Sequence, residues 1–97
     1  MTKEEILSLP LTQQQGLAVL TNSPEVLDIL ANLKDYILKT YVASNVYVSV
    51  ETLWKLYYEE PYIMCYIIAN PNAPEELVLK WNAEKWSIRK PLLQLAH

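Results

Sequence analysis

The chain has 97 residues, enough for one domain that buries roughly 60–70% of its unfolded surface. Its net charge of −3 and pI near 5.0 argue against a nucleic-acid binder, because such proteins usually present a clustered basic face. A single cysteine, Cys65, excludes an internal disulfide and a cysteine-built metal cluster, and it agrees with the reducing cytoplasm, where we expect the protein to reside.

No membrane attachment is expected either. The N-terminus lacks the apolar stretch of a signal peptide. The longest uncharged run, residues 61–74, is too short to cross a bilayer and contains prolines, so we interpret it as core.

Capping residues and prolines divide the chain into helices. Thr2 and Glu5 form a capping-box pattern, and Ser23 before Pro24 is typical of a helix start. Thr12 is expected to cap the second helix. The predicted helices cover residues 3–9, 13–20, 24–31, 36–43, 51–58, 61–69 and 74–82, and a last one starts at residue 86 and is kinked or restarted by Pro91.

Apolar spacing predicts which side chains face the core. The residues expected inside are Leu17, Leu20, Val26, Leu27, Leu30, Ala31, Leu38, Tyr41, Val42, Ile63, Met64, Ile67 and Ile68. Gly16, the only glycine, either admits a neighbouring helix or simply weakens its own. Residues 46–50 have a strand-like composition, yet we expect an extended connector without a sheet partner.

Two landmarks indicate an internal repeat. Leu27, Leu53 and Leu77 are 26 and 24 residues apart, and the aromatic residues Tyr36, Tyr62 and Trp86 have the same separations. A helix pair recurring with such a period is typical of a solenoid, in which neighbouring units stack to bury their apolar faces. The chain is therefore predicted to be a single domain made of a degenerate unit (1–21) and three repeat units (22–45, 46–71 and 72–97).

The junction Ile67-Ile68-Ala69-Asn70-Pro71-Asn72-Ala73-Pro74-Glu75-Glu76-Leu77 resembles the leucine-rich repeat variant family. The matching columns are Leu27, Leu53 and Leu77; Tyr36, Tyr62 and Trp86; Leu38, Met64 and Ile88; and Val42, Ile68 and Leu92. The resemblance implies an all-α fold, a short right-handed helical-repeat solenoid of about eight short helices in four stacked pairs. HEAT-like repeats are the near alternative.

Two departures from the family are visible. Asn45 lacks the following proline and the 44–50 connector is two residues longer, which questions the regularity of the middle stack. The family's prototype is associated with an iron–sulfur cluster bound by cysteines outside the repeats. This chain has no such cysteine cluster, so no cofactor is expected.

No catalytic or metal-binding constellation is recognised, and we expect a protein that is not an enzyme. His97 is the only histidine, and the adjacent pairs Glu4-Glu5, Glu59-Glu60 and Glu75-Glu76 fall at expected helix ends, where solvated carboxylates are common.

The candidate site comes from comparing the repeat columns. The middle unit places Trp54, Tyr58, Cys65 and Tyr66 where the other units have mostly polar residues, and Val78 shares the Trp54 column. Tyrosine and tryptophan are frequent at binding hot spots. One interpretation is a partner-binding patch; the others are a core covered by the 44–50 connector and a homodimer contact.

The function favoured by these residues is a non-enzymatic module that binds a protein partner of unknown identity through an exposed aromatic face of the helical stack, on its concave side or on the side of the first helix of each pair. The alternative is a small acidic inhibitor from a mobile element, whose negative N-terminal two-thirds would occupy the basic groove of a nucleic-acid-handling enzyme. Nucleic-acid binding is the weakest hypothesis, because basic residues gather only at Lys80, Lys85, Arg89 and Lys90.

Overall fold

A computed structural model describes residues 1–84, and every regular element in that range is helical. The helices are α1 (Lys3–Ser8), α2 (Leu11–Leu20), α3 (Pro24–Ala31), α4 (Tyr36–Ser44), α5 (Val50–Glu59), the 3₁₀ helix η1 (Pro61–Ile63) and α6 (Met64–Ala69), followed by helical residues 75–84. The all-α prediction is confirmed for this part of the chain. The predicted connector has no strand structure, but it covers residues 46–49, because Val50 already begins α5. The helix expected from residue 86, with Pro91, lies outside the described residues.

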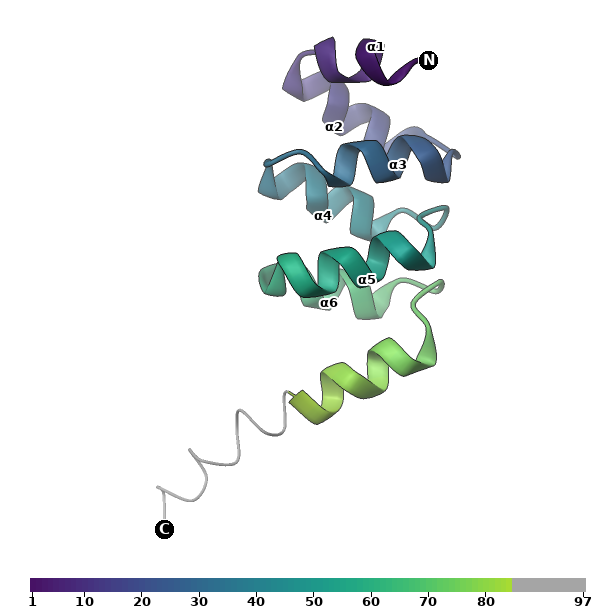
Figure 1. The fold of residues 1–97 in the computed structure, drawn as a ribbon, viewed down its shortest axis with the longest axis vertical. Coiled ribbons are helices and arrows are strands. Elements are labelled where there is room, and N and C mark those ends of the chain that lie inside the picture. Colours follow the sequence, from purple (N-terminus) through teal and green to yellow (C-terminus); the bar gives the residue numbers. More distant parts are fainter. Residues whose placement is uncertain (85–97) are drawn as a thin grey trace.

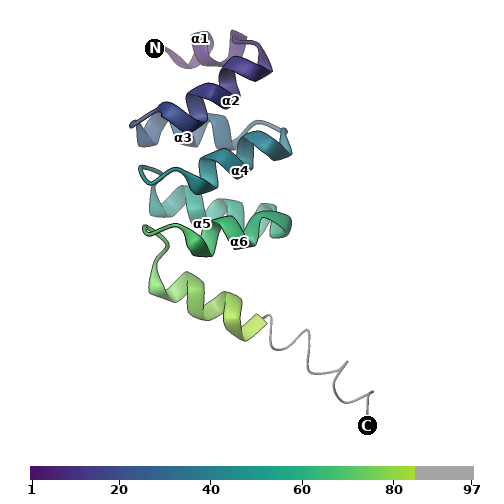
Figure 2. The same ribbon diagram turned by 180° about the vertical axis from the view of Figure 1, so that it is seen from behind.

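The helices form two layers. Helices α1, α3 and α5 lie in one layer, which we call the first layer, and α2, α4 and α6 lie behind them in the second layer (Figures 1 and 2). Within a layer each helix packs against the next, and α2–α3, α3–α4, α4–α5 and α5–α6 pack across the layers.

The core fills the space between the layers. The fully buried large side chains are Ile6, Leu27, Leu30, Leu38, Val42, Thr52, Leu53, Leu56, Ile63, Ile67 and Leu77. Two residues predicted to face inward do not: Leu20 is 80% exposed and Tyr41 is 38% exposed. Both belong to helices with almost no charged residues, so apolar spacing alone could not tell the inner face from the outer one.

Short-range capping largely follows the sequence. The Thr2–Glu5 capping box is present, and the Ser23 hydroxyl accepts from the Val26 amide. The Thr12 prediction is wrong, because α2 begins at Leu11 after Pro10 and has no side-chain cap. A Cβ on Gly16 would meet no atom within 4 Å, so this glycine does not serve a close helix approach.

Two buried asparagines make the same contacts at successive turns. The Asn45 side-chain amide donates to the carbonyls of Ala18 and Thr21, both at 2.9 Å. The Asn70 amide donates to the carbonyls of Ala43, at 2.7 Å, and of Asn45, at 2.9 Å. Each of these bonds ties the end of a second-layer helix to the end of the preceding one in the same layer.

The asparagine oxygens also repeat their role. Oδ1 of Asn45 accepts from the Tyr47 amide and Oδ1 of Asn70 from the Asn72 amide, both at 2.8 Å. At the earlier turn the Thr21 hydroxyl accepts from the Ser23 amide in the same way. The missing proline after Asn45 therefore does not alter this turn.

Burial corrects the alignment of the second-layer helices by one residue. Leu38 and Val42 in α4 are matched in burial and in distance from the asparagine by Ile63 at the end of η1 and Ile67 in α6, an offset of 25 residues rather than the expected 26. With this offset Tyr66 is equivalent to Tyr41, since each lies four residues before its asparagine.

Candidate functional site

The outer face of the second layer is the surface that stands out. Helices α2, α4 and α6 contain one charged residue, Lys39, and it is only 7% exposed. Its ammonium lies 3.3 Å from Glu60 Oε1 and 4.0 Å from Glu59 Oε2. The three helices therefore present essentially no charge to solvent.

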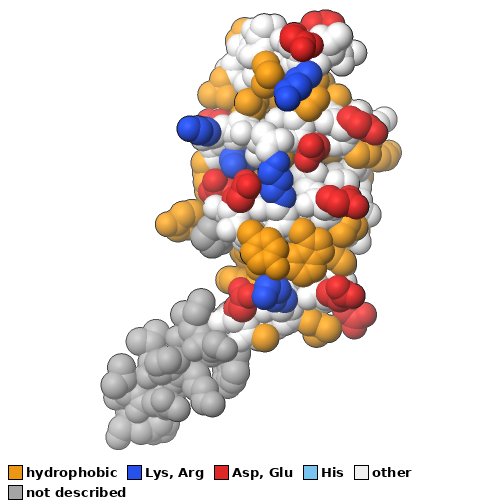
Figure 3. Space-filling model, viewed as in Figure 1, with side chains coloured by type: hydrophobic (Ala, Val, Ile, Leu, Met, Phe, Trp, Pro, Cys, Tyr) orange, Lys and Arg blue, Asp and Glu red, His pale blue; other side chains and the backbone are white. Residues whose placement is uncertain are grey.

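The first layer is different. Acidic and basic side chains are scattered over the face shown in Figure 3, which is the side of α1, α3 and α5. Within residues 1–84 the chain carries eleven carboxylate residues and five lysines. The first layer thus presents a charged face in a chain with an excess of carboxylates, whereas the second layer presents an uncharged one.

Apolar side chains are exposed on the uncharged face. Tyr66 is 42% exposed and Val19 is 55% exposed. The exposed large apolar residues of α2, α4 and α6 are Leu11, Val19, Leu20, Tyr36, Ile37, Tyr41 and Tyr66. Such a concentration is typical of interaction surfaces, because isolated soluble proteins seldom expose contiguous apolar areas.

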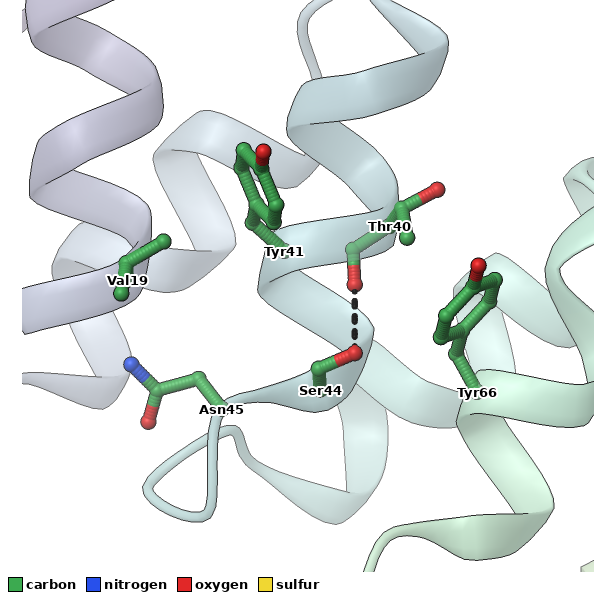
Figure 4. A pocket seen from close by; sticks show the side chains of 6 residues that line it. All are labelled: Val19, Thr40, Tyr41, Ser44, Asn45 and Tyr66. Atoms are coloured by element: carbon green, nitrogen blue, oxygen red, sulfur yellow. Dashed lines mark hydrogen bonds between the residues drawn. The ribbon is translucent and has the colours of Figure 1, made fainter.

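Three hollows cross this face. The central one, of about 390 Å³, is lined by Val19, Thr40, Tyr41, Ser44, Asn45 and Tyr66 (Figure 4). A second, of about 380 Å³, is lined by Gln15, Gly16, Val19, Leu20 and Tyr41. A third, of about 120 Å³, is lined by Ser44, Tyr66, Ala69, Asn70 and Pro71.

Neighbouring hollows share side chains. Val19 and Tyr41 belong to the first two, and Ser44 and Tyr66 belong to the central and third ones. The three hollows therefore form one groove across α2, α4 and α6, which we call the second-layer groove, and each hollow shares a tyrosine with the next.

Hydrogen bonding distinguishes the Thr40 and Ser44 hydroxyls of the groove from those of Tyr41 and Tyr66. The Thr40 hydroxyl donates to the Tyr36 carbonyl at 3.0 Å, and the Ser44 hydroxyl to the Thr40 carbonyl at 2.9 Å, so both donors are used within α4. The Tyr41 and Tyr66 hydroxyls have no hydrogen-bond partner in the part of the chain that the structure describes. They are the groove's available polar groups.

The five residues singled out in the sequence fall into two groups. Trp54 and Tyr58 lie on α5 and Val78 on helix 75–84, whereas Cys65 and Tyr66 lie on α6 in the second layer. Cys65 and Tyr66 are exposed, as expected for outward columns, while Val78 is half-buried.

Trp54 and Tyr58 stack on each other with ring centroids 5.9 Å apart. Tyr58 is 67% exposed, so the connector does not cover it; the connector residue Val48 is instead buried in the core. Trp54 is half-buried and packs against the core. This pair therefore combines a structural residue with an exposed one.

Tyr57, which the sequence did not single out, joins α5 to the helix that follows α6. It is 5% exposed, and its hydroxyl donates to the Glu84 carboxylate. Burial, and then the bonded Glu84 carboxylate, raise the pKa of Tyr57 well above its ordinary value. The Tyr57 hydrogen bond, and then that from Lys80, lower the pKa of Glu84. We interpret this arrangement as structural, because the Tyr57 hydroxyl and the Lys80 ammonium both bond to the same Glu84 carboxylate.

Other kinds of site were also sought in residues 1–84. No group of three or more histidine, cysteine, aspartate or glutamate residues in this range could hold a metal ion. None of its helices is long and apolar enough to cross a membrane. His97 lies outside the described residues.

Sequence reasoning interpreted the uncharged run at 61–74 as core, apart from the outward Cys65 and Tyr66, and did not recognise an uncharged face of the whole molecule. The signal it missed is that residues 11–20 are also uncharged and that residues 36–44 contain only Lys39. Counting charges helix by helix would have identified the second layer as the unusual face.

Comparison of the chain with protein-family models, with curated proteins and with solved structures finds no match in any of the three. The function is therefore argued from the chain's own geometry.

Proposed function

We propose that this chain is a short right-handed helical-repeat solenoid of the leucine-rich repeat variant type, and that it binds a protein partner through the outer face of its second layer without catalysing a reaction. The observation that carries the binding proposal is the second-layer groove: it is uncharged, it is lined by Tyr41 and Tyr66, and it crosses three helices.

Recurring contacts support the repeat. The amides of Asn45 and Asn70 bond to carbonyls 24 to 27 residues earlier in the chain. The Thr52 hydroxyl donates to Asp28 of the preceding unit, 24 residues earlier, at 3.1 Å. Residues about one repeat apart thus bond to one another, as expected where neighbouring units of a solenoid stack.

The composition of the groove supports a protein partner. Charged residues are depleted and tyrosines are enriched at the centres of protein interfaces. Tyrosine contributes a rigid apolar ring and a hydroxyl that still needs a partner, and both Tyr41 and Tyr66 have these properties here. An uncharged surface loses little hydration free energy when another protein covers it.

The acidic inhibitor is kept as a second candidate because of the charge imbalance. The eleven carboxylate residues in residues 1–84, against five lysines, would favour a basic groove on a partner enzyme. Binding of that kind uses the charged side chains of the first layer and weakens steeply with salt.

A pull-down from extracts of the source organism separates the two candidates. Tagged wild-type chain is compared with Tyr66→Lys in the groove and with Leu7→Lys on α1, a first-layer residue of similar exposure that lines no part of the groove. We expect one partner, identified by mass spectrometry, that is retained at low and high salt and by Leu7→Lys but is lost with Tyr66→Lys.

A partner that survives Tyr66→Lys and elutes with salt would contradict the proposal and support the acidic inhibitor. Circular dichroism of each variant establishes that it is folded. Because Tyr66 is partly exposed and makes no hydrogen bond within the described residues, its substitution should leave the fold intact.

A further inference from the structure

We propose that the occupant of the second-layer groove is an extended, uncharged segment of a partner chain in the polyproline II conformation, with apolar side chains or prolines at positions i and i+3 in successive hollows. This inference rests on the proposed function and specifies the chemistry of its partner.

The shape of the groove favours an extended chain. The hollows run across α2, α4 and α6, and Tyr41 and Tyr66 each line two neighbouring hollows, so we infer that their rings act as dividers between one hollow and the next. A helix, about 10–12 Å in diameter with its side chains, needs one continuous trough and would collide with such dividers. An extended segment can instead pass over each ring and place a side chain in the hollow beyond it.

The spacing of the helices selects the conformation of that segment. Packed helices lie about 8–10 Å apart, so equivalent hollows on neighbouring second-layer helices repeat at about that distance. A polyproline II helix has three residues per turn and advances about 3.1 Å per residue, or about 9.3 Å per turn. Side chains at i and i+3 therefore meet successive hollows, whereas the two-residue repeat of a β-strand, about 6.6–6.8 Å, does not match.

The two tyrosines are themselves related by the repeat. Tyr41 and Tyr66 each lie four residues before a buried asparagine, Asn45 or Asn70, whose side chain fixes the turn. Each tyrosine therefore stands at the same position of its unit. A regular ligand with a matching period is the kind that equivalent positions can bind in the same way.

Hydrogen bonding agrees with this occupant. A polyproline II segment has no internal hydrogen bonds, so its carbonyls need outside donors. The Tyr41 and Tyr66 hydroxyls have no partner within residues 1–84 and can donate to those carbonyls. Proline-rich segments in the polyproline II conformation dock in aromatic-lined grooves of other proteins.

Charge restricts the ligand further. No charged side chain lines the three hollows, so a charged anchor would lose its hydration without gaining a counter-charge. The carboxylate excess elsewhere on residues 1–84 also repels acidic flanks. The segment should therefore be uncharged at its anchors and free of aspartate and glutamate nearby.

The test is selection of a display library of random linear peptides on the wild-type chain, followed by fluorescence anisotropy of the enriched peptides after synthesis with a fluorescent label. We expect enrichment of peptides with proline or aliphatic residues three apart and without acidic residues. Binding should weaken at least about tenfold, or roughly 1.4 kcal/mol, with Tyr41→Lys and with Tyr66→Lys, and should be unchanged with Leu7→Lys. Tyr66→Phe, which keeps the ring, should show a smaller loss.

Three results would overturn the inference: no enrichment, enrichment of peptides with a two-residue or helical apolar period, or equal binding to wild type and Tyr66→Lys. Sedimentation of the wild-type chain supplies a further check, since a dimer that Tyr66→Lys dissociates would assign the groove to a second copy. If the native partner is lost with Tyr66→Lys while the library yields nothing, the proposed function stands and the polyproline inference fails.

Discussion

Asn70→Ala tests whether the buried asparagines hold successive helices of the second layer together. Asn70 is 5% exposed and makes three hydrogen bonds: two from its amide, to the carbonyls of Ala43 and Asn45, and one from the Asn72 amide to its oxygen. Alanine removes all three. A buried interaction that spans 25 to 27 residues of sequence is lost with one side chain.

The loss in free energy of unfolding depends on which hydrogen bonds the two carbonyl partners keep in the variant. A hydrogen bond contributes about 1 kcal/mol net, so three contribute about 3 kcal/mol. The Asn45 carbonyl still accepts from the Val48 amide, but the Ala43 carbonyl has no other donor within the described residues. Leaving it buried without a partner adds about 1 kcal/mol or more, for a total of about 3–4 kcal/mol. Domains of this size have about 5–15 kcal/mol in all.

Urea denaturation followed by circular dichroism measures this loss. With a slope of about 1–3 kcal/mol per molar urea, the unfolding midpoint should fall by about 1–4 M. The matched control is Asn22→Ala, at an exposed turn residue whose side chain makes no hydrogen bond within residues 1–84, and it should change the free energy of unfolding by less than about 0.5 kcal/mol. Equal, small effects of both substitutions would refute the reasoning.

Two further substitutions test other parts of the structure. Gly16→Ala should raise the free energy of unfolding by about 0.5–1 kcal/mol, because the glycine is inside α2 and an added Cβ meets nothing within 4 Å; a loss of stability in urea denaturation would show that the helix is packed more tightly there. Tyr57→Phe should raise the pKa of Glu84, measured by NMR titration, because the Tyr57 hydroxyl is the first cause of its lowering. A lowered carboxyl pKa stabilises the folded chain above the unfolded pKa, and this is lost as the pH falls through the folded value, so Tyr57→Phe should reduce the acid-induced loss of stability; an unchanged Glu84 pKa would contradict the assignment.

Local signals were predictable from the sequence. Some of these signals depend on residues close together in the chain, as in the Thr2 and Ser23 caps and the strand-free connector. Others depend on a repeated spacing, as in the buried Leu27, Leu53 and Leu77. Capping and apolar spacing act over three or four residues, which is the range that sequence patterns describe well.

Contacts between distant parts of the chain, and the choice of which helix face points outward, were not predictable in the same way. The bonds of Asn45 and Asn70 join carbonyls 24 to 27 residues away, and nothing in the local sequence names those acceptors. Leu20 and Tyr41 were placed inside because α2 and α4 have no charged face to mark the outside. Lys39 is buried against Glu59 and Glu60, a pairing that only the packed layers reveal.

Of the residues that line the second-layer groove, only Tyr66 was singled out from the sequence. Column comparison placed Cys65 and Tyr66 on the outside, and both are exposed. It also grouped them with Trp54 and Tyr58, which lie on a first-layer helix, because a sequence offset does not show which layer a helix joins. The equivalence of Tyr41 and Tyr66 appears only with the 25-residue offset that burial defines.

The most direct test of binding through the second layer is site-specific photocrosslinking in cells of the source organism. The photoreactive amino acid p-benzoylphenylalanine replaces Tyr66 in the groove in one strain and Leu7 on the first layer in another. We predict a discrete crosslinked product from position 66 and none from position 7. A product from position 7 with none from position 66 would contradict the account.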